Sequence, residues 1–290
     1  MNGVFVVDKP RGLTSHDVVA RVRKAIKSRA VGHAGTLDPM ATGVLVVACG
    51  EGTKLVPYLT AADKEYETTI ALGTTTETLD AEGATKTEAP VPDDWREKLD
   101  EALAAERART DQIPPAYSAI HVDGERAHDL ARAGKEVVLA PRPIEVKSFE
   151  VLRMEESAVT LRVAAAKGYY VRSLARDLAA RLGTVGHLTM LRRTRSGPFA
   201  VAEAIALDAP DFSSRALSIE DAAKRSLPSI VLDDAQTIAA GHGKKLVFPI
   251  ESAAPAVAWL DGDGKLLAIG SIDAEGVGRV VRGFSAAQPR

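Results

Sequence analysis

Residues Gly32–Leu45 read GHAGTLDPMATGVL, and this stretch decides how the N-terminal half of the chain is interpreted. Asp38 follows two glycines and precedes Pro39, so the backbone around this carboxylate is tightly constrained. An aspartate before a proline is more often a turn residue than a catalytic one. His33 adds a second polar group just before an apolar run over 43–49. The stretch therefore indicates a rigid loop that holds a carboxylate at the start of a buried strand.

Elements on both sides of this loop predict a mixed α/β body with a β-rich tail. Thr14 or Ser15 is expected to cap the first helix. A change of composition near 226–228 indicates a boundary, and beyond it the turn Asp261–Gly264 between apolar runs indicates a hairpin. We expect strands over 3–8, 43–49, 66–72 and 159–165 and helices over 16–27, 93–109 and 173–182.

The composition is that of an ordinary globular protein. The chain has 290 residues, 46% of them hydrophobic, which excludes the disordered and low-complexity classes. No apolar run reaches the roughly 18–20 residues that span a bilayer. The first residues, MNGVFVVDK, lack a secretory signal pattern, and one cysteine, Cys49, can form neither an internal disulfide nor a thiolate metal site. We therefore expect a cytoplasmic protein that holds no metal.

Common cofactor motifs are absent from the sequence. It contains no GxxxxGK[S/T] loop, no GxGxxG and no HExxH pattern. The GHAG tetrapeptide matches the GxxG of an RNA-binding KH loop, but so short a match has low specificity and lacks the flanking elements of a KH domain. We expect no nucleotide, redox or metal cofactor.

Charge is distributed unevenly along a chain whose formal net charge is only −2. Residues 1–60 carry eight Lys or Arg against four acids, and residues 161–200 carry eight against one. Residues 80–112 carry ten acids against five bases. Segregated basic segments are the pattern of a polyanion-binding protein, although charge alone favours a salt-bridged surface.

Asp38 and Arg172 form a candidate pair of nucleophile and cation. A carboxylate acts as a covalent nucleophile when it stays ionised in a partly desolvated pocket, and a nearby guanidinium stabilises the ionised form. Tyr66 and Tyr170 offer rings that can stack on a nucleobase.

These residues lie in blocks that resemble the bacterial TruB family of tRNA pseudouridine synthases. The longest block is the stretch quoted above, and five shorter ones follow the family's order over about residues 3–200. They are Lys9–Ser15 (KPRGLTS), Lys64–Tyr66 (KEY), Gln112–Ala119 (QIPPAYSA), Lys167–Leu174 (KGYYVRSL) and Leu191–Arg193 (LRR).

The resemblance implies that the chain isomerises uridine 55 in the T loop of tRNA to pseudouridine. It implies that Asp38 is the catalytic aspartate, attacking either C6 of the base or C1′ of the sugar, and that Arg172 pairs with it. The uracil then rotates and rejoins through C5, which loses its proton. The reaction exchanges no electron or phosphoryl group, in agreement with the missing cofactor motifs.

The same resemblance assigns the substrate-binding residues. His33 is expected to pack into the T loop where the uridine has flipped out, and Tyr66 to stack on the uracil. Tyr170 and Leu191 are expected to line the base pocket. Two tyrosines compete for one of these assignments, because the family commonly has a small residue in place of Tyr169; the spacing to the arginine favours Tyr170.

The implied architecture is α+β: a mixed, largely antiparallel central sheet flanked by helices, the pseudouridine synthase fold, followed by a small β-rich, PUA-like domain. We expect the catalytic domain over 1–226, with an insertion over about 114–142 that closes on RNA, and the PUA-like RNA-binding domain over 227–290. The partner is tRNA through its T stem-loop, with no membrane and no protein partner, and the chain is expected to be a monomer. We expect salt to weaken tRNA binding.

Two alternatives to this stand-alone synthase are an RNA-binding helper that refolds tRNA without chemistry and a guide-RNA-dependent synthase similar to the dyskerin family. A helper role is compatible with the enzyme, and Asp38, Tyr66 and Arg172 together favour catalysis. The absence of long terminal extensions argues against the guide-dependent class.

Overall fold

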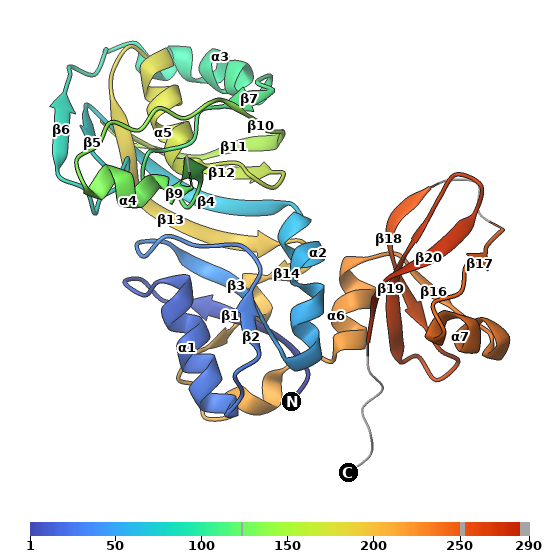
Figure 1. Cartoon of the computed structure of the whole chain (residues 1–290). Coiled ribbons are helices and arrows are strands. Elements are labelled where there is room, and N and C mark those ends of the chain that lie inside the picture. The colour runs from blue at the N-terminus through green and yellow to red at the C-terminus, as the bar shows by residue number, and fades with distance from the viewer. Residues whose placement is uncertain (123, 250–252, 285–290) are drawn as a thin grey trace.

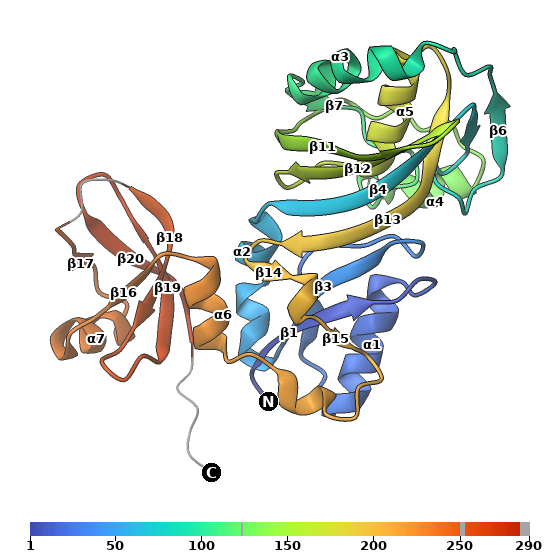
Figure 2. The same ribbon diagram turned by 180° about the vertical axis from the view of Figure 1, so that it is seen from behind.

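Two sheets organise the computed structural model, which describes residues 1–122, 124–249 and 253–284 (Figures 1 and 2). The larger sheet has nine strands: β1 (Gly3–Lys9), β2 (Val31–His33), β3 (Thr42–Cys49), β4 (Lys64–Leu72), β11 (Val146–Met154), β12 (Ala158–Ala165), β13 (Gly186–Ser196), β14 (Phe199–Ala200) and β15 (Ile205–Ala206). The smaller sheet has five: β16 (Ser229–Val231), β17 (Leu246–Val247), β18 (Ala254–Leu260), β19 (Leu266–Ile272) and β20 (Val277–Gly283).

The larger sheet is mixed but largely antiparallel. Its strand order is β11-β12-β4-β13-β3-β1-β15, with β14 beside β13 and β2 beside β3. Only the β1–β15 and β3–β13 pairs are parallel among its described pairings. The fold class expected from the sequence is therefore confirmed.

Helices cover both faces of this sheet around β1 and β3, which explains why β1 is apolar without alternation, whereas β12 alternates buried and half-buried residues. Phe5 and Val7 of β1 belong to one core, and Val4 and Val6 belong to another on the opposite face. The helices are α1 (Ser15–Ile26), α2 (Val56–Ala61), α3 (Trp95–Arg107), α4 (Ala127–Arg132), α5 (Val171–Arg181), α6 (Ile219–Ser226) and α7 (Asp234–Gly241), with 3-10 turns η1 (Gly50–Leu55), η2 (Val201–Glu203) and η3 (Phe212–Arg215).

The first helix shows how local chemistry sets an element boundary. Thr14 is the N-cap: its hydroxyl accepts from the backbone N–H of Asp17 at 3.1 Å, and the Asp17 carboxylate accepts from the N–H of Thr14 at 2.8 Å. This reciprocal capping box selects Thr14 over Ser15 as the cap. Ser15 is left free to contact the Asp38 loop.

The smaller sheet packs on the larger part of the molecule through a shared core. Ala258, Leu260 and Ile269 cluster with Val4 and Val6 of β1. The expected hairpin is present between β18 and β19. The domain boundary at 226/227 stays a prediction; α6 ends there and β16 begins three residues later.

A charged segment lies between two short strands, β7 (Asp111–Gln112) and β10 (Arg142–Pro143), which pair with each other. It contains the hairpin β8 (His121–Val122) and β9 (Glu125–Arg126), followed by α4. We call residues 113–141 the insertion. Its small core consists of Ile120, Ala127 and Leu139. One further ribbon pairs β5 (Thr74–Thr76) with β6 (Thr85–Glu88).

Candidate active site

The loop that carries Asp38 joins β2 to β3 and depends on glycine at two positions. Gly35 has φ +96° and Gly43 has φ +98°, in the region that side chains disfavour. A Cβ on Gly43 would lie 2.2 Å from the carbonyl oxygen of Arg193. The glycines of the motif therefore let the loop pass directly against β13.

Buried side chains beneath the loop hold it by its backbone. The Ser15 hydroxyl accepts from the N–H of Leu37 at 2.9 Å and donates to the Leu37 carbonyl at 3.1 Å. The Lys9 ammonium donates to the Pro39 carbonyl at 3.2 Å. Lys9 and Ser15 thus bracket Asp38 on both sides, although the sequence indicated no function for either.

Arg193 holds the same loop from β13. Its guanidinium donates to the carbonyls of Val44 at 2.6 Å, Gly35 at 3.1 Å and Thr36 at 3.5 Å. The side chain is only 1% exposed. A buried guanidinium is stable only where such acceptors meet it, so the loop and Arg193 stabilise each other.

Asp38 faces Arg172, the second residue of α5. Arg172 Nε lies 2.9 Å from Asp38 Oδ2, and Nη2 donates to Oδ1 at 3.0 Å. This two-point geometry fixes the plane of the carboxylate as well as its position. The Arg172 side chain is 7% exposed and that of Asp38 is 31% exposed. The structure therefore brings the predicted pair together and leaves the carboxylate open on one side.

The Arg172 guanidinium also contacts two other parts of the chain. It donates to the carbonyls of Thr78 at 3.1 Å and Tyr117 at 2.9 Å, and its Nε lies 3.8 Å from Asp80 Oδ2. Asp80 is buried and accepts from the Thr78 hydroxyl at 2.5 Å. Sequence reasoning missed Asp80, because nothing in its local pattern distinguishes it from the other acids of 80–112.

Tyr66 and Leu191 lie on neighbouring strands of the sheet. Tyr66 of β4 pairs with Arg193 of β13, and Thr68 pairs with Leu191. Tyr66 is half-buried against the main core, and Leu191 is buried within it. Both therefore lie in the part of the sheet that supports the Asp38 loop.

The structure separates the two candidate tyrosines. Tyr169 is buried in the main core, and burial raises the pKa of its hydroxyl. Tyr170 packs instead against the small core of the insertion. Burial also raises the pKa of Tyr170, whereas the positive charges of Arg142 and Arg172 lower it. Tyr170 is therefore the tyrosine near the ion pair, as the spacing favoured.

The chain matches known proteins over most of its length. The family model for the N-terminal domain of TruB family pseudouridylate synthases covers residues 23–171, and that for the C-terminal domain of tRNA pseudouridylate synthase B covers 172–253. The tRNA pseudouridine synthase B of Mycobacterium sp. (strain KMS) is 49% identical over 249 residues, 84% of each chain. That of Aromatoleum aromaticum (strain EbN1) is 44% identical over 283 residues, 95% of this chain and 90% of the relative. The chain belongs to the TruB family.

Membership of the TruB family confirms the expected class of enzyme, a pseudouridine synthase. Solved structures agree. The crystal structure of a Cbf5–Nop10–Gar1 complex matches 99% of this chain and 85% of its own with a TM-score of 0.76 and 28% identity. An H/ACA RNP bound to a substrate RNA containing 2′-deoxyuridine gives a TM-score of 0.70 at 28% identity, over 99% of this chain and 86% of its own.

His33 of this TruB-family chain lies on β2, where the chain enters the Asp38 loop. Its ring meets that of His16 edge-on, with the centroids 5.6 Å apart. Its Nδ1 is buried without a hydrogen-bond partner among the described residues. Burial, and then the charges of His16 and Arg193, lower the pKa of His33. These effects favour a neutral imidazole at neutral pH.

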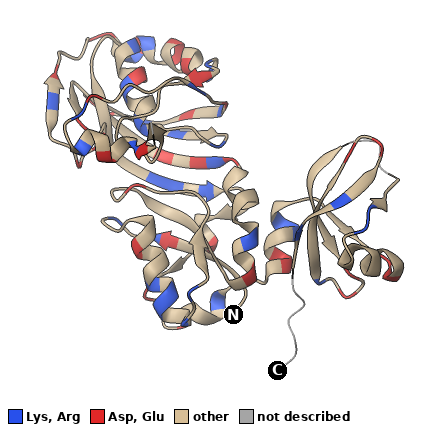
Figure 3. Cartoon of the chain, viewed as in Figure 1, with Lys and Arg blue, Asp and Glu red and all other residues tan. Residues whose placement is uncertain are grey.

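Ionisable groups of both signs lie near Asp38 in this site. Burial lowers the pKa of Lys9 to about 8, although the carboxylates of Glu82 and Asp38 oppose the shift. Burial raises the pKa of Glu82, and the charges of Asp80 and Asp38 add to the effect. Figure 3 shows basic residues along β13, where Arg192, Arg193 and Arg195 follow closely.

The described part of the chain lacks two features. Residues 1–122, 124–249 and 253–284 contain no group of three His, Cys, Asp or Glu side chains placed to hold a metal ion. No helix among them is both long and apolar enough to cross a membrane.

Proposed function

We propose that this TruB-family chain converts uridine 55 in the T loop of tRNA to pseudouridine, in the cytoplasm and without a guide RNA. The observation that carries the proposal is the geometry of Asp38: one side of the carboxylate is bound at two points by a buried arginine, and the other is open. Such a carboxylate is oriented before the substrate arrives.

The reaction rearranges bonds within one nucleotide. Asp38 attacks either C6 of the uracil or C1′ of the ribose, and the N1–C1′ bond breaks. After the base rotates, a C5–C1′ bond forms and the bond between Asp38 and the attacked carbon breaks, which releases the carboxylate; the C5 proton leaves and N1 gains a proton. Product and substrate therefore have the same composition, and no external oxidant or reductant takes part.

The remaining predicted residues receive the base. The uridine leaves the helical stack before Asp38 can reach it, at a cost of a few kcal/mol that contacts in the pocket offset. Tyr66 supplies a ring for stacking and is a candidate for removing the C5 proton, and Tyr170 and Leu191 bound the pocket. His33, neutral and at the edge of the loop, takes the place that the uridine vacates.

The choice of a stand-alone enzyme over a guide-dependent one rests on the sequence relatives. Proteins named tRNA pseudouridine synthase B are 43–49% identical, whereas the Cbf5 complexes are 28% identical or less. We propose accordingly that a monomer acts on tRNA directly, through the T stem-loop. The smaller sheet, as a PUA-like unit, supplies a second RNA contact.

The direct test is tritium release from tRNA labelled with [5-³H]uridine. Wild type releases one tritium per tRNA, and a transcript with cytidine at position 55 releases none. Asp38→Asn keeps the shape of the side chain and lowers the rate by at least about a thousandfold, while filter binding shows that it still binds tRNA.

Different results identify the failing part of the proposal. Release that persists with cytidine 55 contradicts the assignment of that position. Release that persists in Asp38→Asn contradicts the role of the aspartate. Binding without release by wild type favours the RNA-binding helper.

A further inference from the structure

The start of the insertion is fastened to the start of α5. Five hydrogen bonds join residues 112–117 to residues 170–176 among the described contacts. Ser173 Oγ and Arg176 Nη2 both donate to the Ile113 carbonyl at 2.9 Å. Since residues 170–172 include the pocket tyrosine and the arginine that binds Asp38, this attachment touches the site directly.

Gln112 makes the most specific of these contacts. Its side-chain amide accepts from the backbone N–H of Tyr170 at 3.0 Å and donates to the Tyr170 carbonyl at 3.2 Å. Gln112 is only 1% exposed, so no solvent replaces these bonds if they are lost. One side chain thus occupies both backbone groups of a single residue.

Tyr170 needs such a partner because of its place in the helix. It is the N-cap of α5, and its own side chain makes no capping hydrogen bond. Backbone N–H groups at a helix start have no partner inside the helix. Gln112 therefore accepts from the N-cap N–H of this helix as Asp17 does in α1, but from a distant segment.

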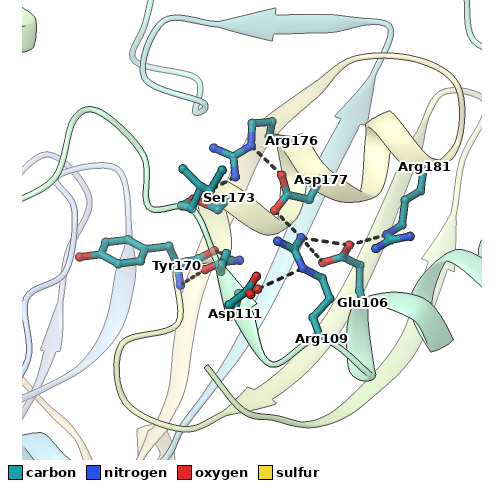
Figure 4. Close-up of polar contacts among 10 residues, drawn as sticks. Glu106, Arg109, Asp111, Tyr170, Ser173, Arg176, Asp177 and Arg181 are labelled. Atoms are coloured by element: carbon teal, nitrogen blue, oxygen red, sulfur yellow. Dashed lines mark hydrogen bonds and ion pairs between the residues drawn. The ribbon is translucent and has the colours of Figure 1, made fainter. Parts of the chain in front are cut away.

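Gln112 also lies at the base of the insertion. It is the last residue of β7 and pairs with Arg142 of β10, where the insertion returns. Figure 4 shows Tyr170 with its ring directed away from the ion pairs that tie α3 to α5, such as Arg181 Nε to Glu106 Oε1 at 2.6 Å. The helix body is held by those ion pairs, and its N-cap residue is held by Gln112.

We propose that Gln112 is a positioning residue for isomerisation: by clamping the Tyr170 backbone it sets the Tyr170 ring and the Arg172 guanidinium relative to Asp38. This inference rests on the proposed function, since it assigns a task to the same site. It also links the insertion to the nucleophile, because any shift of the β7–β10 stem moves Gln112.

The test compares Gln112→Met, which keeps the chain length but removes both hydrogen bonds, with Thr69→Val. The control removes a hydroxyl pair with Thr160 at 3.0 Å elsewhere in the sheet. In single-turnover tritium release, Gln112→Met lowers the rate about tenfold or more, with tRNA affinity and reaction amplitude unchanged. Thr69→Val retains the wild-type rate.

The rate at saturating enzyme and the enzyme concentration needed for saturation separate positioning from general stability. Partly unfolded enzyme raises the concentration needed but leaves the saturating rate unchanged, and that result overturns the proposal. A wild-type rate in Gln112→Met also overturns it. Ser173→Ala, which removes one of the two donors to the Ile113 carbonyl, is the milder second variant and lowers the rate about threefold.

Hydrogen exchange measures the clamp independently of activity. In Gln112→Met the Tyr170 amide exchanges at least about tenfold faster than in wild type, while amides in the middle of α5 keep their protection. Unchanged exchange at Tyr170 overturns the proposal even if wild type proves inactive on tRNA. An inactive wild type with a protected Tyr170 amide contradicts the proposed function and leaves the clamp supported.

Discussion

The Asp38 loop and the insertion face the same site but are held in opposite ways. The loop is fastened along its length by Ser15, Lys9 and Arg193, all buried in the main body. The insertion has a small core of its own and joins the body chiefly at its base. One wall of the site is thus anchored at several points in the main body, and we expect the other to adapt to RNA.

This difference matches the demands of the chemistry. A nucleophile gains rate from being held in one geometry, because no reorganisation is then needed in the transition state. A folded RNA presents a large irregular surface, which a segment with few anchors can follow. The four predictions below test whether the two walls differ as described.

The largest effect is expected from Arg172→Met, which removes the guanidinium that binds both Asp38 in the loop and the Tyr117 carbonyl in the insertion. Asp38 and buried Asp80 both lose their cation, and we expect the rate of tritium release to fall at least about a thousandfold. Arg162→Met, which removes exposed ion pairs to Glu67 and Glu150, serves as the control. Equal rates for the two variants would show that Asp38 does not depend on its arginine.

Arg193→Met tests the fixed wall. Its loss leaves the carbonyls of Val44 and Gly35 buried without their donor, which we expect to lower the free energy of unfolding by about 3 kcal/mol. Urea denaturation followed by circular dichroism measures this. A change below about 1 kcal/mol would mean that the loop does not depend on the guanidinium.

Lys64 of β4 adjoins the fixed wall and makes stability depend on pH: its Cε would lie 3.7 Å from a Cβ on Gly35 of the Asp38 loop. Burial, and then the charge of Arg193, lower the pKa of Lys64 to about 8 from 10.5. Between these values the unfolded chain binds more protons than the folded one, so stability rises with pH in that window. We expect the free energy of unfolding of wild type, relative to Lys64→Met, to rise by about 2–3 kcal/mol from pH 8 to pH 10.5. If the difference in free energy of unfolding between wild type and Lys64→Met stayed constant from pH 8 to pH 10.5, the lowered pKa of Lys64 would be contradicted.

The smallest effect is expected from Leu139→Ala in the insertion. A buried leucine in a main core costs 2–5 kcal/mol on truncation, about 3 on average. Because the insertion can open locally, we expect the urea midpoint of the whole chain to change by less than about 0.3 M, with faster amide exchange confined to residues 118–141. A loss of free energy of unfolding as large as that for a main-core leucine would show that the insertion is held as firmly as the loop.

Much of the fold follows from local pattern. Continuous apolar runs predicted β1 and β3, and spacing with a cap predicted α1. β13 was not predicted as a strand, because three arginines interrupt its apolar pattern. The Arg193 guanidinium is stable when buried because it donates to backbone carbonyls such as that of Val44, 149 residues earlier in the chain. No short stretch of sequence contains that information.

The residues of the site also fall into those that a local motif predicted and those that depend on distant partners. The Asp38–Arg172 pair was predicted because each residue lies in a distinctive motif, and the structure places them in contact. Asp80 and Gln112 were assigned no role, since each matters only through a partner distant in sequence. The roles of His33, Tyr66, Tyr170 and Leu191 stay predictions.

The parallel pairing of β1 with β15 has a consequence for biosynthesis. Val7 pairs with Ile205, and Gly43 pairs with Arg193, so the strand and loop made first are completed by residues that lie 198 and 150 positions later in the chain. Contacts of such long sequence separation form late in folding. A ribosome must therefore release about two hundred residues before the nucleophile's loop receives its buried arginine, and a nascent chain that stops earlier carries Asp38 without its catalytic setting.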